Sequence, residues 1–163
     1  MGKGEEEWGN GGGAPRFSPL PLLRSPFTDI LPLGLSMRGL HLIAELHDCR
    51  CADALLADAG TLRALCLDVC SVPGLTPVGQ AFHQFGTVDA PAGATGAVIL
   101  AESHLAVHTW PELRAVTLDL YVCNFSQDNS SAARDACERL LAAFAPVRVV
   151  QREIVRGEPG ERG

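Results

Sequence analysis

The stretch Gly93-Ala-Thr-Gly-Ala-Val-Ile-Leu-Ala-Glu-Ser-His-Leu-Ala-Val-His-Thr-Trp-Pro-Glu112 joins an apolar run to a dense group of polar side chains. Residues 97–101 form the apolar run, and a short continuous run of this kind is typical of a buried strand. Two imidazoles, two hydroxyls and two carboxylates follow within eleven residues. A strand end holds such groups rigidly, so we expect a reactive cluster here. The polar residues considered are Glu102, Ser103, His104, His108, Thr109 and Glu112.

Alternating and helical patterns on both sides of this stretch predict the other elements. They are a strand at 40–46, a helix over 52–70, a strand at 76–85, a loop at 86–96, strands at 97–101 and 115–123, a helix from Ser130 or Ser131 to about Phe144, and a strand at 147–155. The order β-α-β-β-β-α-β indicates an α+β, two-layer sandwich in which one mainly antiparallel sheet carries helices on one face. Cys66 and Cys70 are expected in the core, on an apolar helix face.

Composition excludes several classes of protein. The 163 residues are 47% hydrophobic and carry a net charge of −6, which is typical of a globular domain and argues against a nucleic-acid or anionic membrane surface. No apolar run approaches the length of a transmembrane helix. Six cysteines are too few for a disulfide scaffold, and Glu5, Glu6 and Glu7 stand where a secretory signal would be basic. We therefore expect a cytoplasmic protein with reduced thiols.

Residues 1–36 differ in composition from residues 37–163. Gly and Pro together make up 12 of these 36 residues, which interrupts helices and removes donors that a sheet needs. We expect a disordered or loosely attached tail, followed by one domain at 37–163. A second interpretation is that translation begins at Met37, where the pattern changes.

The residues alone leave several interpretations of the polar cluster open. It can be an ordinary strand end with satisfied hydrogen bonds. His104 and His108, together with His83 and a carboxylate, could bind zinc, although residues 105–107 look extended rather than helical. A Ser-His-acid hydrolase is also open, but Ser103 lacks the Gly-x-Ser-x-Gly turn.

The run Ala101-Glu-Ser-His-Leu-Ala-Val-His-Thr-Trp-Pro-Glu112 resembles the prokaryotic-type, pyruvoyl-dependent S-adenosylmethionine decarboxylase proenzymes. The resemblance covers about residues 38–157. It includes Gly39-Leu-His-Leu-Ile-Ala-Glu45, Phe82-His-x-Phe85, Thr95-Gly96 and Asp119-Leu-Tyr-Val-Cys123. The tail has no counterpart in the family.

The resemblance implies that the chain cuts itself between Glu102 and Ser103. The Ser103 hydroxyl would attack the carbonyl of Glu102, and elimination would convert Ser103 into a covalent pyruvoyl group. No standard side chain is an electrophilic ketone, whereas a pyruvoyl group can form a Schiff base with an amine and accept the electrons that CO2 leaves behind. The implied reaction is decarboxylation of S-adenosylmethionine for spermidine biosynthesis.

The resemblance also implies a role for each matching residue. His108 would remove a proton during processing, Thr95 would support the oxyanion, and Cys123 would donate a proton in catalysis. The substrate-binding residues would be Phe85, Trp110 and Glu112. Because Phe85 is expected to reach a neighbouring protomer, the cleaved β and α chains would form a homodimer, a larger sandwich. No metal is implied.

This sequence departs from the family pattern around the substrate. Many members have Tyr-Gly-Tyr after the Pro-Glu pair, whereas this chain has Leu113-Arg114-Ala115. Arg114 near the pocket could disfavour a cationic substrate. A pyruvoyl-dependent ornithine or arginine decarboxylase on the same fold, and a non-cleaving binding paralogue, therefore remain alternatives.

Overall fold

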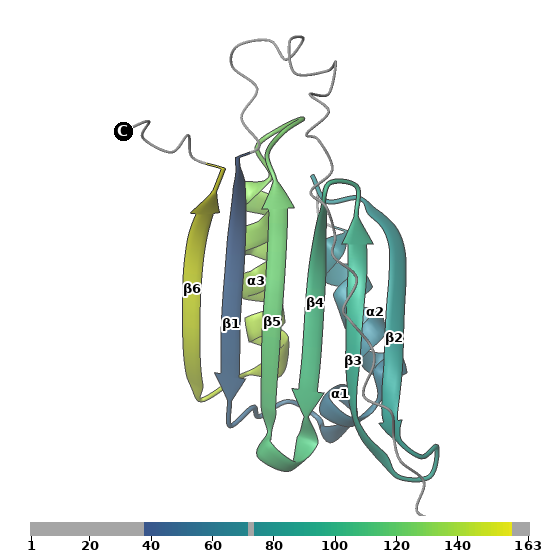
Figure 1. Cartoon of the computed structure of the whole chain (residues 1–163). Coiled ribbons are helices and arrows are strands. Elements are labelled where there is room, and N and C mark those ends of the chain that lie inside the picture. Colours follow the sequence, from purple (N-terminus) through teal and green to yellow (C-terminus); the bar gives the residue numbers. More distant parts are fainter. Residues whose placement is uncertain (1–37, 72–73, 158–163) are drawn as a thin grey trace, which may run out of the picture. The chain divides into compact units, whose positions relative to one another are not determined.

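The computed structural model of the chain describes residues 38–71 and 74–157. Six strands form one sheet in the order β2-β3-β4-β5-β1-β6, and every neighbouring pair is antiparallel (Figure 1). The elements are β1 (Gly39–His47), α1 (Asp53–Ala57), α2 (Ala59–Cys70), β2 (Pro77–Gly86), β3 (Pro91–Leu100), β4 (Ser103–Trp110), η1 (Pro111–Leu113), β5 (Ala115–Cys123), α3 (Ser130–Phe144) and β6 (Arg148–Arg156). The expected α+β architecture is confirmed.

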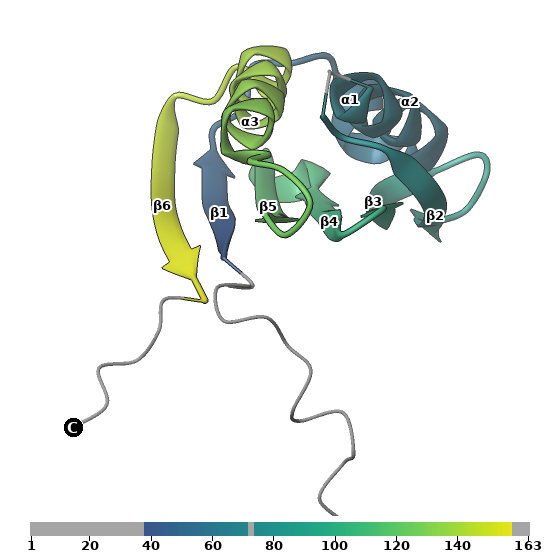
Figure 2. The same ribbon diagram turned by 90° about the horizontal axis from the view of Figure 1, so that it is seen from above.

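The helices α1, α2 and α3 lie on the same face of the sheet (Figure 2). Alternate strand residues point toward them and form the core, among them Leu42, Leu105 and Leu120, with Cys66 and Cys70 buried from α2 as expected. Within the described residues, no helix covers the other face, which we call the open face. Its side chains include His41, Thr95, His104, His108, Tyr121 and Cys123.

The expectations for residues 86–110 were wrong in two places. Residues 91–96 belong to strand β3 rather than to a loop. Their glycines allow neighbouring residues to pack closely against the strand and do not mark a turn. Gly96 lies against the ring of Phe82, which leaves no room for a Cβ. The polar stretch after this strand is itself strand β4, in which buried Leu105 and Val107 alternate with exposed side chains. The same alternation is present in the sequence, but the polar residues were interpreted as a cluster at a strand end rather than as the exposed face of a strand.

The helical segment at 52–70 is two helices rather than one. Asp58 has an extended backbone, and its carboxylate accepts a hydrogen bond from the Thr61 N–H at 2.7 Å, so it caps the start of α2. The C-terminal helix is confirmed, but its N-cap position is Asn129 rather than a serine. The Asp128 carboxylate accepts a hydrogen bond from the Ser130 N–H at 2.9 Å.

The remaining expectations concern the chain as a whole. Within the described residues, every helix is too short or too polar to cross a bilayer. All six cysteines are free. The expected tail at 1–36, and with it the boundary at Met37, lies outside the described residues.

Candidate functional site

The expected cleavage position lies in a tight turn between two paired strands. Leu100 ends β3 and pairs with Ser103, the first residue of β4, so only Ala101 and Glu102 form the turn. The Ser103 Oγ accepts a hydrogen bond from the backbone N–H of Cys123 at 3.0 Å. The structure thus brings together Ser103 and Cys123, which twenty residues separate in the sequence.

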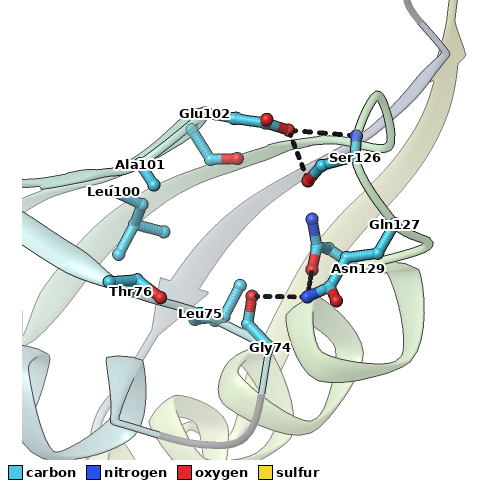
Figure 3. A pocket seen from close by; sticks show the side chains of 10 residues that line it. Gly74, Leu75, Thr76, Leu100, Ala101, Glu102, Ser126, Gln127 and Asn129 are labelled. Atoms are coloured by element: carbon cyan, nitrogen blue, oxygen red, sulfur yellow. Dashed lines mark hydrogen bonds between the residues drawn. The ribbon is translucent and has the colours of Figure 1, made fainter.

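A small cavity of about 100 Å³ lies beside this turn (Figure 3). The loop before α3 forms part of its wall, and the Ser126 hydroxyl donates a hydrogen bond to the Glu102 carboxylate at 3.2 Å. Gln127 and Asn129, from the same loop, line the cavity and are hydrogen-bonded to each other at 2.9 Å. Residues on both sides of the Glu102–Ser103 bond are therefore held by the end of β5 and the segment that follows it.

Thr95 and His108 form a separate pair on the open face. They are direct partners across β3 and β4, and the Thr95 hydroxyl lies 2.6 Å from Nδ1 of His108. His108 lies five residue steps from Ser103 along β4, which corresponds to about 16 Å at roughly 3.3 Å per residue. Within one chain, the structure does not bring His108 to the expected cleavage position.

The expected substrate-binding residues lie toward the His108 end of the sheet. Trp110 follows His108 on β4, with ring centroids 6.2 Å apart, and both Trp110 and Phe85 are exposed. Glu112 is exposed in η1, directly after Trp110. A cavity of about 330 Å³ on this side is lined by residues that include His83, Thr95 and His108.

Arg114 takes no part in the open face. Its guanidinium donates hydrogen bonds to the Cys49 and Cys51 carbonyls and forms an ion pair with Asp53 at 2.8 Å. The hydrogen bond to Asp53 is the main cause that raises the pKa of Arg114. This side chain fastens the start of α1 and is paired with Asp53, and it lines a cavity of about 370 Å³ together with Glu112.

Thr109 belongs to the core rather than to the reactive cluster. It is 3% exposed, donates a hydrogen bond to the Leu56 carbonyl at 2.7 Å and accepts one from the Ala94 N–H at 2.9 Å. For Thr109, the interpretation as an ordinary strand residue with satisfied hydrogen bonds is therefore the correct one.

The sequence analysis missed a cluster on the open face. The Asp119 carboxylate lies 2.7 Å from Nε2 of His41 and 3.4 Å from Nε2 of His104, and Tyr121 lies beside both imidazoles. The odd-numbered residues of the alternating 115–123 strand could have signalled that Asp119 and Tyr121 share one face. His104 and His108 thus have different partners, Asp119 and Thr95. Within the described residues, no group of three or more His, Cys, Asp or Glu side chains is arranged to hold a metal ion.

Comparison with known proteins gives a consistent result. A family model described as S-adenosylmethionine decarboxylase matches residues 40–157. The "S-adenosylmethionine decarboxylase proenzyme" of Thermoplasma volcanium is 36% identical over 126 residues, covering 77% of this chain and 89% of that protein. The protein of the same name from Archaeoglobus fulgidus is 36% identical over 108 residues, covering 66% of this chain and 88% of that protein.

A solved structure agrees with these sequence matches. The crystal structure of the adenosylmethionine decarboxylase from Aquifex aeolicus superposes with a TM-score of 0.65 at 28% identity. The similarity covers 78% of this chain and 98% of that one.

Proposed function

Because this chain belongs to the S-adenosylmethionine decarboxylase family, we propose that it is a proenzyme that cuts itself between Glu102 and Ser103 and then decarboxylates S-adenosylmethionine. The observation that carries the proposal is the position of Ser103. Its hydroxyl is held by the Cys123 N–H in a tight turn, next to the carbonyl that it must attack. The turn also joins two strands that remain paired if the peptide bond is cut.

The residues present fit a pyruvoyl group formed from Ser103. The serine supplies the carbon atoms of the group, the turn presents its peptide bond, and the 100 Å³ cavity beside it has room for water. Such a group supplies an electrophilic carbonyl, which accepts electrons from an amine substrate as CO2 departs. Cys123, whose backbone already holds Ser103, has its side chain on the open face and is our proton donor in catalysis.

Processing needs a proton acceptor and an oxyanion donor, which we assign to His108 and Thr95. Their 2.6 Å contact fixes the imidazole against the hydroxyl. Because both lie about 16 Å along the sheet from Ser103 of the same chain, we assign them to the Ser103 of a second copy.

A symmetric homodimer built on the open faces satisfies this requirement. Two sheets that stack head to tail place the Ser103 and Cys123 end of one copy over the His108 end of the other. Phe85, Trp110 and Glu112 lie toward the His108 end, so each active site would take its nucleophile from one copy and its adenosyl-binding groups from the other.

Residue 103 must also reach the open face during this process. Ser103 lies on the same face of β4 as Leu105 and Val107, which face the helices. Cleavage frees the start of β4 from Glu102, and the new chain end can then turn toward the side chain of Cys123. We infer that cutting the turn and completing the active site are one structural event.

The side chains favour S-adenosylmethionine over ornithine or arginine. Exposed aromatic rings at Phe85 and Trp110 suit an adenine base and a sulfonium ion, and Glu112 suits ribose hydroxyls. Ornithine and arginine offer no aromatic group for these rings. The decarboxylated product would serve as the aminopropyl donor for spermidine.

The test compares the full chain with Ser103→Ala, and with Ser71→Ala as a matched control at the exposed end of α2. The wild type and the control should separate on a denaturing gel into 102-residue and 61-residue chains, the shorter one with a blocked N-terminus. Ser103→Ala should stay whole and inactive. CO2 release should be faster from S-adenosylmethionine than from ornithine or arginine.

Three outcomes would contradict the proposal in different ways. A Ser103→Ala chain that still splits at this bond excludes the mechanism. A wild type that never splits indicates the non-cleaving binding paralogue. A split enzyme that prefers ornithine or arginine keeps the processing chemistry and changes the substrate.

A further inference from the structure

Tyr121 occupies a confined position next to Cys123. Both side chains project from β5 onto the open face, two residues apart. The Tyr121 ring lies over Gly39, where a Cβ would stand 2.7 Å from Cε2 and 2.9 Å from the hydroxyl oxygen. Gly39 is the direct cross-strand partner of Cys123, and side chains in that relation start about 5 Å apart. The phenol hydroxyl therefore lies across from the Cys123 thiol.

Three other side chains contact the Tyr121 ring, and a fourth holds two of them. The guanidinium carbon of Arg156 lies 4.3 Å from the ring centroid, a cation–π contact. His41 and His104 flank the ring with centroids 5.9 and 5.8 Å away. Asp119 binds both imidazoles, so the flanking rings are themselves fixed. A side chain restrained on this many sides can direct its neighbour.

We propose that Tyr121 is the positioning residue of the Cys123 thiol: its hydroxyl donates a hydrogen bond to Sγ and directs the S–H proton toward the substrate carbon that loses CO2. This inference rests on the proposed function, in which Cys123 is the proton donor. Tyr121 itself touches neither substrate nor prosthetic group.

The ionisation of the phenol is consistent with a donor role. Burial raises the pKa of Tyr121, and the negative charge of a neighbouring Cys123 thiolate raises it further, while Arg156 acts in the opposite direction. The phenol therefore keeps its proton at neutral pH. A neutral phenol can donate to sulfur in both the thiol and the thiolate state.

Directing the proton matters because two carbons compete for it. When the S–H bond breaks and a C–H bond forms on the substrate carbon, a thiolate remains, and hydrolysis with one water molecule then releases the product amine and restores the prosthetic group. Protonation on the carbon that came from Ser103, followed by hydrolysis with one water molecule, leaves alanine at that position and releases the substrate skeleton as an aldehyde. The second route consumes the prosthetic group, so the ratio of inactivations to turnovers reports where the proton goes.

The first experiment compares self-cleaved wild type, Tyr121→Phe and the control Ser71→Ala with S-adenosylmethionine. Intact-mass spectrometry of the 61-residue chain counts conversion to alanine, and CO2 release counts turnovers. Tyr121→Phe should cleave itself normally, because processing uses the backbone N–H of Cys123 and not its thiol. Its ratio of inactivations to turnovers should rise about 2- to 10-fold, the range expected for one lost hydrogen bond.

The second experiment does not depend on catalysis. In uncleaved Ser103→Ala protein, iodoacetamide labelling of the Cys123 peptide should slow about 2- to 10-fold when Tyr121→Phe is added, since the donor that stabilises the thiolate is gone. Arg156→Gln keeps the Tyr121 hydroxyl but removes the cation–π contact that restrains the ring. It should change the labelling rate and the ratio of inactivations to turnovers in the same direction as Tyr121→Phe, but by a smaller factor. Should Tyr121→Phe fail to fold, this variant carries the test.

Unchanged labelling and an unchanged ratio of inactivations to turnovers would overturn the role of Tyr121. A wild type without decarboxylase activity would instead contradict the proposed function, and the labelling comparison would still decide whether Tyr121 governs the thiol.

Discussion

Cys123 uses its backbone and its side chain for different purposes. Its N–H holds the Ser103 hydroxyl, while its thiol lies on the open face beside Tyr121. Substituting the side chain leaves the backbone donor in place. The residue can therefore be removed from catalysis without being removed from processing.

We expect Cys123→Ala to cut itself at Glu102–Ser103 and to lose turnover by about 10²–10⁴-fold, the usual contribution of one general acid. Intact masses give the cleaved fraction, and CO2 release gives the rate. Cys51→Ala, at a half-buried cysteine outside the open face, is the control and should keep near-normal turnover. Normal turnover by cleaved Cys123→Ala would return this residue to a purely structural role.

At the scale of elements, one buried hydroxyl ties α1 and β3 to β4. The Thr109 hydroxyl donates a hydrogen bond to the Leu56 carbonyl and accepts one from the Ala94 N–H. Both are backbone groups that water cannot reach once the helices pack.

Thr109→Val keeps the shape of the side chain and removes its hydrogen bonds. We expect a loss of about 1–3 kcal/mol, since buried groups left unpaired cost that much, and hence a fall in Tm of roughly 3–15 °C. Thr87→Val, at an exposed turn whose Ala90 N–H can bond to water instead, should change Tm far less. A Thr109→Val protein that melts with the wild type would show that this tie does not matter.

The elements also show where sequence patterns suffice. Residues 40–46 and 115–123 alternate cleanly, and 130–144 has a helical period, so these elements were predicted correctly. Residues 91–96 were not, because Gly93 and Gly96 resemble turn residues until Pro111 and Phe82 pack against them. That cause lies in other strands, which no local window contains. The same holds for Ser103 and His108: the family motif identifies both, but only the strand between them shows how far apart they lie.

At the scale of the whole molecule, the separation of Ser103 from His108 predicts complementation. Co-expressed Ser103→Ala and His108→Ala chains should form mixed dimers in which the intact Ser103 of the second chain meets the intact His108 of the first. The His108→Ala chain should then be cut more rapidly than when expressed alone. Distinct affinity tags and a denaturing gel identify which chain is cut.

Complementation depends on the site being shared between copies. If His108 acted within its own chain, mixing would not increase cleavage of the His108→Ala chain. A pair combining Ser103→Ala with the double variant Ser103→Ala/His108→Ala offers the matched control, since no chain in it can be cut.

Residues 1–36 should be dispensable. The family match begins at residue 40, and the strand β1 begins at Gly39. A chain beginning at Met37 should cut itself and decarboxylate substrate as the full chain does, measured by gel and by CO2 release. An insoluble or uncut product would show that the first 36 residues are required.

Cleavage next to the two-residue turn at Ala101 and Glu102 changes how the mature protein can refold after it unfolds. Before the cut, β3 and β4 belong to one polypeptide, and an unfolded chain can refold on its own. After the cut, the same two strands belong to separate molecules held only by pairing and packing. Formation of each protomer then becomes a second-order encounter of two fragments, which slows as the protein is diluted, whereas each protomer of the uncut Ser103→Ala precursor can refold from a single chain. After self-cleavage, an unfolded molecule would therefore regain its structure much less readily than the precursor that first folded as one chain.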